Sequence, residues 1–525
     1  MNRPLDRLLE NLTPFRAADG RTFVHIPPSA CFGPRSFPVR SRAFRDWFFD
    51  HAYTTLDRYP SQPLLHSAIS HLEAQAARDP SRHRIPTALR IVAQGSRPFP
   101  DLLRLHLADP SSRYVEITPA GWQTTIGQPA HFEPSRSAES LDPPVHPDPA
   151  APNPLDSLRQ TLRFPAQSPD WLRCLLWLLA ALRPGSPYPI LILRGPSGSG
   201  KSVAARILRS IADPSVSLFT PTPANPAQLL NFARHSWILA FDHVARLSPT
   251  LSETLCRLSS GLAVTMPDDP HAQPAQRYIS RPILLTVTDD FTPSPDLAAR
   301  SLVVDLPPMT AEARRDEAEL THAVAEARPA LLGAVCDVLS AILRHPRTAV
   351  PHSTRHAGAL AWVLAAASAL TVTEDQIRQA FTPRPYDTRL IEALQSLLRG
   401  NPTWKGTATD LTLLLPLNPN PRLLSIQLRN NRLDLAEAGI SLEFKRDPGG
   451  PRMIHLAASQ NPAADPQPES LQLLTDDKPV RREPHSCVTS PNPSLPPSGA
   501  GLQPAADVSP PASASVVTPA TQSPP

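Results

Sequence analysis

The stretch Gly195-Pro196-Ser197-Gly198-Ser199-Gly200-Lys201-Ser202 decides the fold of this chain. The apolar run Pro189–Leu193 before it reads as a short buried strand, and Lys201–Ala212 after it reads as a helix. Glycines in this position let successive backbone N–H groups turn inward and cradle phosphate oxygens. Lys201 would then meet the β and γ phosphates, and Ser202 would give its hydroxyl to Mg²⁺. We therefore predict that residues 195–202 bind a nucleoside triphosphate, with Mg-ATP as the expected ligand; the alternative is a chance Gly/Ser turn.

A second apolar run, Trp237–Phe241, ends in an acid, Asp242, about 40 residues after the loop. A buried strand that ends this way aims a carboxylate at a metal ion, so Ser202 and Asp242 are the predicted Mg²⁺ ligands. Alone, the pattern also fits an ordinary strand with a terminal Asp. His243 follows, where many ATPases carry the Glu that polarises water. It is a candidate to accept or relay a proton, or the mark of a slow enzyme.

Two further positions are candidates for catalysis. Thr286, at the end of the strand predicted over Arg281–Val287, is a candidate sensor of the γ-phosphate, or simply a strand-end Thr. Arg300 is a candidate arginine finger supplied to a neighbouring subunit, or a surface salt-bridge partner. Further strands are predicted at 236–241 and 301–306, with a helix at 251–259. Strands that alternate with helices predict an α/β core, with a parallel sheet covered by helices on both faces.

Length and composition indicate several domains. The chain has 525 residues, 67 of them proline, and a net charge of +4. Such a length predicts two to four domains, and prolines must concentrate in loops and tails. The expected organisation is an α+β region over 1–131, a Pro-rich linker over 132–155, a P-loop ATPase core over 156–309, a helical region over 310–385, a winged-helix-like domain over 386–458 and a disordered Pro/Ser/Ala-rich tail over 459–525.

The first region should contain a strand over 21–26, helices over 41–56 and 63–77, and strands over 89–93, 102–107 and 114–118, with Gly121-Trp122 at a turn. A helix is expected to start at Ser168-Pro169-Asp170, because Ser is a good N-cap and Pro fits the first turn. Further helices are expected over 310–345 and 355–381.

Cysteine usage and the apolar runs narrow the protein class. Five scattered cysteines without a CxxC pair argue against a disulfide framework and a zinc ribbon, and Cys174 and Cys256 should be core residues. Residues 1–14 carry charges and lack the apolar core of a signal peptide. The longest apolar run, Trp171–Leu182, is too short to span a bilayer. The expected location is the cytoplasm, without membrane contact.

The segment 388–457 predicts a small DNA-binding module. Helices over 389–398, 407–415 and 421–438 precede two strands, 440–446 and 452–456, around the turn 447–450. This order is typical of a winged helix, which sets its third helix in the major groove and its wing on the backbone. The candidate DNA contacts are Arg422, Gln427, Arg429, Asn430, Arg432, Lys445, Arg446 and Arg452. The alternative is that these charges only solvate a domain packed on the ATPase.

Taken together, the motifs over 189–308 resemble the ATPase domain of phage- and integrative-element-encoded ATP-binding proteins, which are related to superfamily 3 and primase-associated helicases. The matching stretches are 190–202, 238–244, 247–249, 255–258, 281–285 and 296–302, with 114–122 upstream and 404–411 and 449–456 downstream. The resemblance implies ATP-dependent work on DNA in the replication of a mobile element. It also implies a ring with ATP at subunit interfaces, and a primase or other replication protein as partner.

The sequence departs from these relatives at three places. Relatives usually carry Asn where His243 and Thr286 stand, and a basic, Tyr-containing stretch where 261–269 has neither. The first hypothesis is therefore a helicase-like or translocase-like ATPase acting on DNA. The alternative is a nucleotide-gated DNA-binding regulator, loader or defence sensor with little hydrolysis. A small-molecule phosphotransferase is the third reading, which the C-terminal module and Arg300 disfavour.

Overall fold

The computed structural model describes most of the chain up to residue 458. The described ranges are 4–29, 33–78, 87–95, 99–127, 131–133, 135, 137–217, 219–266, 275–289, 291–309, 315–346, 356–383, 388–415, 420–446 and 452–458. The tail expected over 459–525 lies outside them. No helix in these ranges combines the length and the apolar character needed to cross a membrane.

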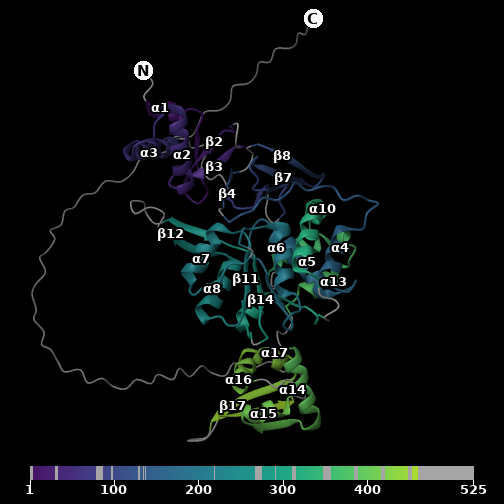
Figure 1. Ribbon diagram of the computed structural model, residues 1–525. Helices are drawn as coiled ribbons and strands as arrows, with labels where there is room; N and C mark the ends of the chain where they lie inside the picture. The colour runs from purple at the N-terminus through teal and green to yellow at the C-terminus, as the bar shows by residue number, and fades with distance from the viewer. Residues whose placement is uncertain are drawn as a thin grey trace, which may run out of the picture. The chain divides into compact units, whose positions relative to one another are not determined.

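A four-stranded parallel sheet forms the centre of the fold (Figure 1). Its strands, in spatial order, are β11 (Leu239–Val244), β14 (Ile283–Val287), β10 (Ile190–Arg194) and β15 (Ser301–Asp305). The predicted parallel sheet is confirmed. The strand expected over 236–241 lies three residues further on, because Trp237 and Ile238 place their backbone N–H groups on the Asp213 carboxylate instead of entering the ladder.

Helices cover both faces of this sheet, and β10 shows why its sequence is continuously apolar. Ile190 and Ile192 pack into one core cluster, and Leu191 and Leu193 pack into the other. The first cluster includes α7 (Pro226–His235) and α8 (Pro249–Ser260), with α9 (Pro295–Ala298) at its edge. The second includes α5 (Pro169–Ala181), α6 (Lys201–Ala212) and α10 (Glu317–Arg344). Strands buried on both faces read as apolar runs for this reason.

Most helices around the sheet begin with the same short signal. Ser168, Asn225, Ser248 and Ser294 each accept a hydrogen bond from a backbone N–H of the first turn, and each is followed by Pro. Ser or Asn caps the helix and Pro fits its first position. The helix expected at Ser168 is confirmed, and Cys174 and Cys256 are buried core residues as predicted. The prediction missed α7 and α4 (Pro154–Thr161), although Asn225-Pro226 and Asn153-Pro154 carry the same signal.

Two antiparallel sheets make up the N-terminal region. The first has β1 (Thr13–Arg16), β2 (Thr22–Ile26) and β3 (Arg35–Pro38), with α1 (Pro4–Leu9), α2 (Arg42–Leu56) and α3 (Gln62–Arg78) beside it. The second has β5 (Ile91–Gln94), β6 (Leu102–His106), β7 (Arg113–Thr118) and β8 (Gly121–Ile126); β4 (Thr87–Ala88) pairs with β9 (His131–Phe132). Placing Gly121-Trp122 at a turn was wrong: Gly121 pairs with Thr118, so Pro119-Ala120 form the turn and Trp122 lies in β8.

The proline-rich stretch after β9 runs along the core. Between 133 and 153 the described residues form no helix or named strand, as expected. Their backbone is nevertheless anchored: Leu141 N–H donates to Leu107 at 2.7 Å, and Val145 N–H donates to Pro329 at 3.0 Å. The Leu141 side chain is buried. This stretch therefore packs against both the second N-terminal sheet and α10.

Gly333 of α10 allows the closest of these contacts. A Cβ atom there would lie 2.0 Å from the Val145 carbonyl oxygen. We expect Gly333→Ala to lower the free energy of unfolding by about 1–3 kcal/mol, since overpacking outweighs the better helix propensity of Ala. Urea unfolding monitored by tryptophan fluorescence measures the change. Gly400→Ala is the matched control, because nothing lies within 4 Å of that position; equal midpoints for the two variants would contradict the prediction.

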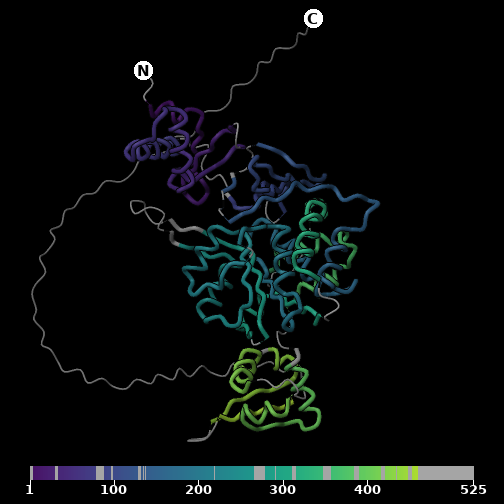
Figure 2. The backbone as a smooth tube through the Cα atoms, viewed as in Figure 1, coloured from purple at the N-terminus to yellow at the C-terminus, as the bar shows by residue number. Residues whose placement is uncertain are grey.

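The remaining helices pack on α5 and α10. They are α11 (Ala357–Leu364), α12 (Ala367–Leu370) and α13 (Glu374–Phe381), and their apolar residues join the cluster of α5 and α10. In Figure 2 the backbone can be followed from the teal central sheet into these green helices. Of the helix expected over 310–345, the stretch from Glu317 to Arg344 is helical, and residues 310–314 lie outside the described residues. The helical region expected over 355–381 is present in three pieces.

Residues 388–458 have a hydrophobic cluster of their own. The elements are α14 (Thr388–Gly400), β16 (Thr403–Gly406), α15 (Ala408–Leu414), α16 (Pro421–Asn430), α17 (Arg432–Glu437), β17 (Ile440–Arg446) and β18 (Arg452–Ala458), with the sheet order β16-β18-β17. The three helices and the hairpin follow the expected order. A continuous helix over 421–438 was wrong: it breaks at Asn431, whose buried amide donates to the Gln427 carbonyl. The strand β16 was not foreseen.

Candidate functional site

The loop between β10 and α6 has the backbone that its glycines predict. Gly195, Gly198 and Gly200 adopt φ values of 150°, 77° and 84°, which L-residues rarely adopt. A Cβ at Gly195 would also lie 2.6 Å from the Leu306 carbonyl oxygen. The backbone conformation and the close packing therefore both require glycine in this loop.

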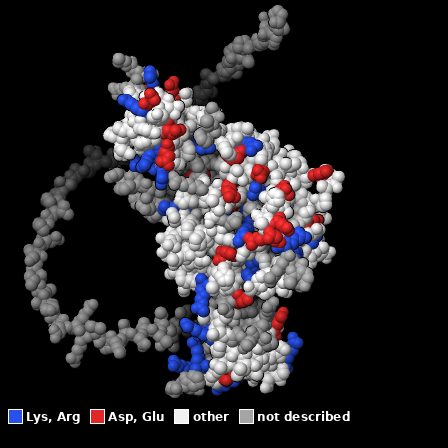
Figure 3. Space-filling view, viewed as in Figure 1, with Lys and Arg blue, Asp and Glu red and all other residues white. Residues whose placement is uncertain are grey.

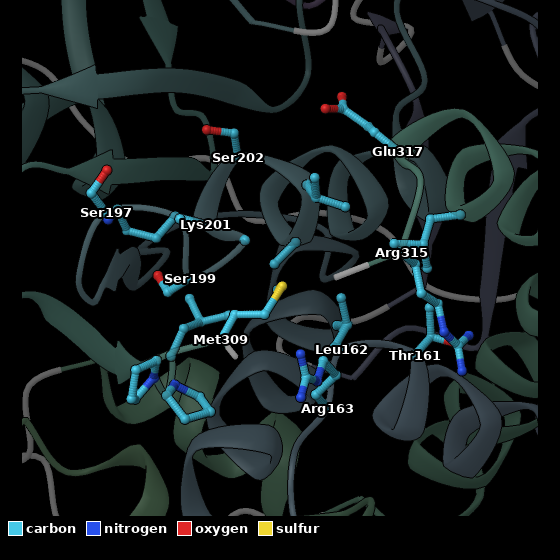
Figure 4. A pocket seen from close by; sticks show the side chains of 18 of the residues that line it. Thr161, Leu162, Arg163, Ser197, Ser199, Lys201, Ser202, Met309, Arg315 and Glu317 are labelled. Carbon is cyan, nitrogen blue, oxygen red and sulfur yellow. The ribbon is translucent and has the colours of Figure 1, made fainter. Parts of the chain in front are cut away.

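Two polar side chains of the loop lie at a cavity (Figure 4). Lys201 reaches back across the loop, and its Nζ donates to the carbonyl oxygens of Gly195 at 2.5 Å and Pro196 at 3.0 Å. The Ser199 hydroxyl is buried and has no hydrogen-bond partner among the described residues. An ammonium group and an unpaired hydroxyl beside a glycine turn suit an anionic ligand.

The structure brings Ser202, Asp242 and Thr286 together. Ser202 Oγ donates to the two Asp242 carboxylate oxygens at 2.8 and 3.0 Å, and Thr286 Oγ1 donates to the same carboxylate. The backbone N–H of His243 donates to Thr286 Oγ1 at 2.8 Å. These residues meet because β10, β14 and β11 are adjacent and parallel, so their carboxyl ends share one edge of the sheet.

The roles of Thr286 and His243 differ in this arrangement. Thr286 is 1% exposed and lies behind Asp242, where it orients the carboxylate, and it is absent from the lining of the cavity. His243 lies on the lining and has a left-handed backbone, with φ of 56°. Of these two residues, His243 lines the cavity and Thr286 does not.

The cavity has a volume of about 930 Å³ and extends well beyond the loop. Its lining includes Leu306–Met309 after β15 and Gln160–Arg163 at the end of α4. Arg315, just before α10, and Glu317, the first residue of α10, also line it. Figure 4 shows Arg163 and Arg315 at the end of the cavity away from Ser197. Sequence reasoning missed these arginines, since they come from segments about 40 and 110 residues from the loop with no local motif.

Arg300 lies away from this cavity. Its carbonyl oxygen accepts a hydrogen bond from the N–H of Ile190, the first residue of β10, so Arg300 is at the edge of the sheet opposite the loop. A five-residue strand separates the two edges by roughly 16 Å. The guanidinium pairs with Asp296 at 3.2 Å. Arg300 therefore does not contribute to the cavity of its own chain, and a role toward a neighbouring subunit stays a prediction.

The predicted DNA contacts are distributed over four elements of the C-terminal domain. Arg422, Gln427, Arg429 and Asn430 lie on α16, Arg432 begins α17, Lys445 and Arg446 end β17, and Arg452 begins β18. Some of them have protein partners. Asn430 Nδ2 donates to the Pro293 carbonyl at 3.2 Å, and Lys445 Nζ lies 2.8 Å from Glu443.

The site residues fit Mg-ATP. In the described ranges no cluster of three or more His, Cys, Asp or Glu side chains is arranged to hold a metal alone. Magnesium at nucleotide sites usually takes one or two protein oxygens and completes its shell with phosphates and water. The touching oxygens of Ser202 and Asp242, beside the positive-φ loop and the Ser199 hydroxyl, match that donor set.

Fold and site together define an α/β protein with a parallel sheet, helices on both faces, and a candidate anion site at the carboxyl edge of the sheet. Residues 155–380 match the family of actinomycete integrative conjugative element replication proteins. This match agrees with the resemblance to integrative-element proteins inferred from the motifs. No curated protein sequence matches the chain.

Comparison with solved structures finds two chains described as helicases and one described as a C-terminal region. A chain described as the active helicase Cch of SCCmec type IV is 12% identical with a TM-score of 0.41, covering 85% of this chain and 93% of that one. The C-terminal region of NrS-1 in its apo form is 10% identical with a TM-score of 0.34, covering 87% and 100%. The JCV helicase is 14% identical with a TM-score of 0.22, covering 43% and 70%.

Proposed function

We propose that this protein binds Mg-ATP at residues 195–202 and hydrolyses it in helicase-like or translocase-like work on DNA, during replication of a mobile element. The observation that carries the proposal is the contact of Ser202 Oγ with the Asp242 carboxylate at the mouth of the glycine loop. The match of residues 155–380 to replication proteins of integrative elements supplies the biological setting.

The proposal assigns a role to each part of the site. Backbone N–H groups of the loop and Lys201 would hold the β and γ phosphates, and Ser202 and Asp242 would hold Mg²⁺. Bound Mg²⁺ would neutralise charge on the phosphates. Thr286 fixes the Asp242 carboxylate. The far end of the cavity, lined by Met309, Leu162 and Arg163, would hold the nucleoside. Stacking of a guanidinium on the base is one contact that Arg163 offers there.

A second function has one observation in its favour. The residue after Asp242 is His243, which lines the cavity and has a left-handed backbone conformation. Imidazole is a weaker anchor for water next to a metal-bound phosphate than a carboxylate, which favours slow turnover. A nucleotide-gated DNA-binding regulator with little hydrolysis is therefore the alternative.

ATP hydrolysis by the full chain, measured without DNA and with single-stranded or forked DNA, tests the proposal. We expect DNA to stimulate turnover and Lys201→Ala to abolish it, because the ammonium group is lost from the phosphate site. Lys405→Ala, an exposed lysine on β16, is the matched control and should retain the wild-type rate. Tight ATP binding without turnover under every condition would contradict a motor and favour the regulator.

The proposed assembly has its own test. If Arg300 serves the site of a neighbouring subunit, ATP should promote assembly, and Arg300→Ala should reduce turnover without weakening ATP binding. The mass of the protein in solution is measured with and without ATP. Turnover and ATP affinity are compared between Arg300→Ala and the wild type. A strict monomer in both states would exclude the trans role.

A further inference from the structure

Two arginines from different elements converge on one aromatic ring in the C-terminal domain. The guanidinium carbon of Arg429, on α16, lies 5.4 Å from the centroid of the Phe444 ring, on β17. That of Arg452, on β18, lies 4.9 Å from the same centroid. Both distances are within the range of a cation–π interaction. Phe444 therefore joins the helix to the hairpin through two cations.

A third arginine lies on the same face of the hairpin. Side chains alternate along a strand, so Arg446 shares a face with Phe444, and the register places Arg446 directly opposite Arg452. Like charges directly opposite each other destabilise a strand pair. We call Arg429, Phe444, Arg446 and Arg452 the Phe444 cluster. Its three arginines are exposed, and Figure 3 shows Lys and Arg side chains gathered along the side of this domain where α16 and β17 lie.

The carboxylate of Glu443 lies on the opposite face of the hairpin. There Glu443 pairs with Lys445 at 2.8 Å, and Lys445, His455 and Arg432 lower the pKa of Glu443. Lys445 thus forms an ion pair with Glu443, and Arg432 interacts electrostatically with the same carboxylate. Within the described ranges, no ion pair joins Arg429, Arg446 or Arg452 to a carboxylate. Among the described residues of this domain, an acid thus pairs with the lysine on one face of the hairpin, and no carboxylate pairs with the three arginines of the Phe444 cluster.

We propose that the Phe444 cluster clamps backbone phosphates of DNA, with Phe444 as the positioning residue that holds the guanidinium groups of Arg429 and Arg452. The clamp rests on the proposed function, and it divides the candidate DNA contacts into two sets. Guanidinium groups bind phosphate oxygens in a bidentate manner, and an anion between Arg446 and Arg452 removes their repulsion. Contacts to phosphate carry no sequence information, so the clamp binds DNA of any sequence.

DNA binding by the full chain over a range of salt concentrations tests the clamp. The probes are a labelled single strand and a labelled duplex of arbitrary sequence. Arg429→Ala, Arg446→Ala and Arg452→Ala should each weaken binding and reduce the slope of log affinity against log salt by about 1, because each removes one phosphate contact. Lys405→Ala, which removes an exposed lysine on β16 that is not among the candidate DNA contacts, is the matched control and should bind as the wild type does.

Variants of Phe444 test its positioning role. Phe444→Leu keeps an apolar side chain but has no ring, so affinity should fall about 3- to 10-fold; Phe444→Trp, which keeps the cation–π surface, should restore it. Unchanged thermal unfolding and unchanged ATP hydrolysis without DNA show that the fold and the nucleotide site are intact. A structural role alone would not produce rescue by Trp.

The outcomes separate the clamp from the proposed function. If the wild type binds DNA and all three arginine variants keep its affinity and salt slope, the clamp is overturned, while DNA-stimulated turnover still supports the proposed function. If Phe444→Leu and Phe444→Trp bind equally, the positioning role of Phe444 is overturned. If the wild type binds no DNA at any salt concentration, both proposals fail together.

Discussion

Replacing Asp242 by Asn is expected to lower ATP turnover about 100- to 1,000-fold while leaving the fold intact. The Asp242 carboxylate accepts hydrogen bonds from Ser202 Oγ at 2.8 and 3.0 Å and a further one from Thr286. The Asn amide has the same shape and keeps one acceptor oxygen, so the local packing survives. The amide lacks the negative charge with which a carboxylate binds a hard cation such as Mg²⁺.

Steady-state hydrolysis at several Mg²⁺ concentrations measures the loss, with ATP affinity determined separately. Asp50→Asn makes the same chemical change at an exposed position of α2 and should leave the rate unchanged. Because Thr286 acts through Asp242, Thr286→Val is expected to have a smaller effect on the rate than Asp242→Asn. Wild-type turnover by Asp242→Asn would mean that the carboxylate has no part in the reaction.

Replacing Asp213 by Ala is expected to destabilise the protein by about 3–5 kcal/mol, the cost typical of breaking a buried ion pair. Asp213 pairs with Arg90 at 2.8 Å, and the side chains are 6% and 1% exposed. The same carboxylate accepts the backbone N–H groups of Trp237 at 3.1 Å and Ile238 at 2.8 Å. Its removal leaves the buried charge of Arg90 without a counter-ion, although backbone carbonyl oxygens still accept from the guanidinium, and it leaves two buried backbone donors without their acceptor.

Thermal and urea unfolding of the full chain measure this effect. Glu253→Ala is the control, because Glu253 and Arg257 are 57% and 63% exposed and such pairs contribute at most about 1 kcal/mol. Replacing Arg90 and Asp213 together by apolar residues should cost less than the two single changes combined. An Asp213→Ala variant as stable as Glu253→Ala would exclude a structural role for the buried pair.

Local signals explain what the sequence predicted well. The spacing of Gly195, Gly198 and Gly200 between an apolar run and a helix identified the loop, and the structure gives all three positive φ values. The Ser-Pro and Asn-Pro pairs marked helix starts, although only the one at Ser168 was used. The break at Asn431 was missed because α16 and α17 have a continuous helical pattern, and nothing local reports that the Asn431 amide is buried.

Contacts over long separations could not be predicted from one sequence. Arg90 and Asp213 are 123 residues apart, and neither lies in a motif. Arg163 and Arg315 reach the cavity from α4 and from the residues before α10. The hairpin register decides which basic residues stand opposite each other, and so it separates Arg446 and Arg452 from Lys445. Composition alone does not distinguish Arg446 and Arg452 from Lys445.

By itself the sequence determined the glycine loop, the strand and helix around it, and the acid at the end of a later strand, because each depends on neighbouring residues. Only the tertiary structure decided that Ser202 and Asp242 touch. Ser202 lies on α6, after β10, and Asp242 lies on β11. Strand β14 lies between β10 and β11, which is why Thr286 reaches the same carboxylate. Strand order is set by burial of both sheet faces across the whole chain, and no local pattern encodes it.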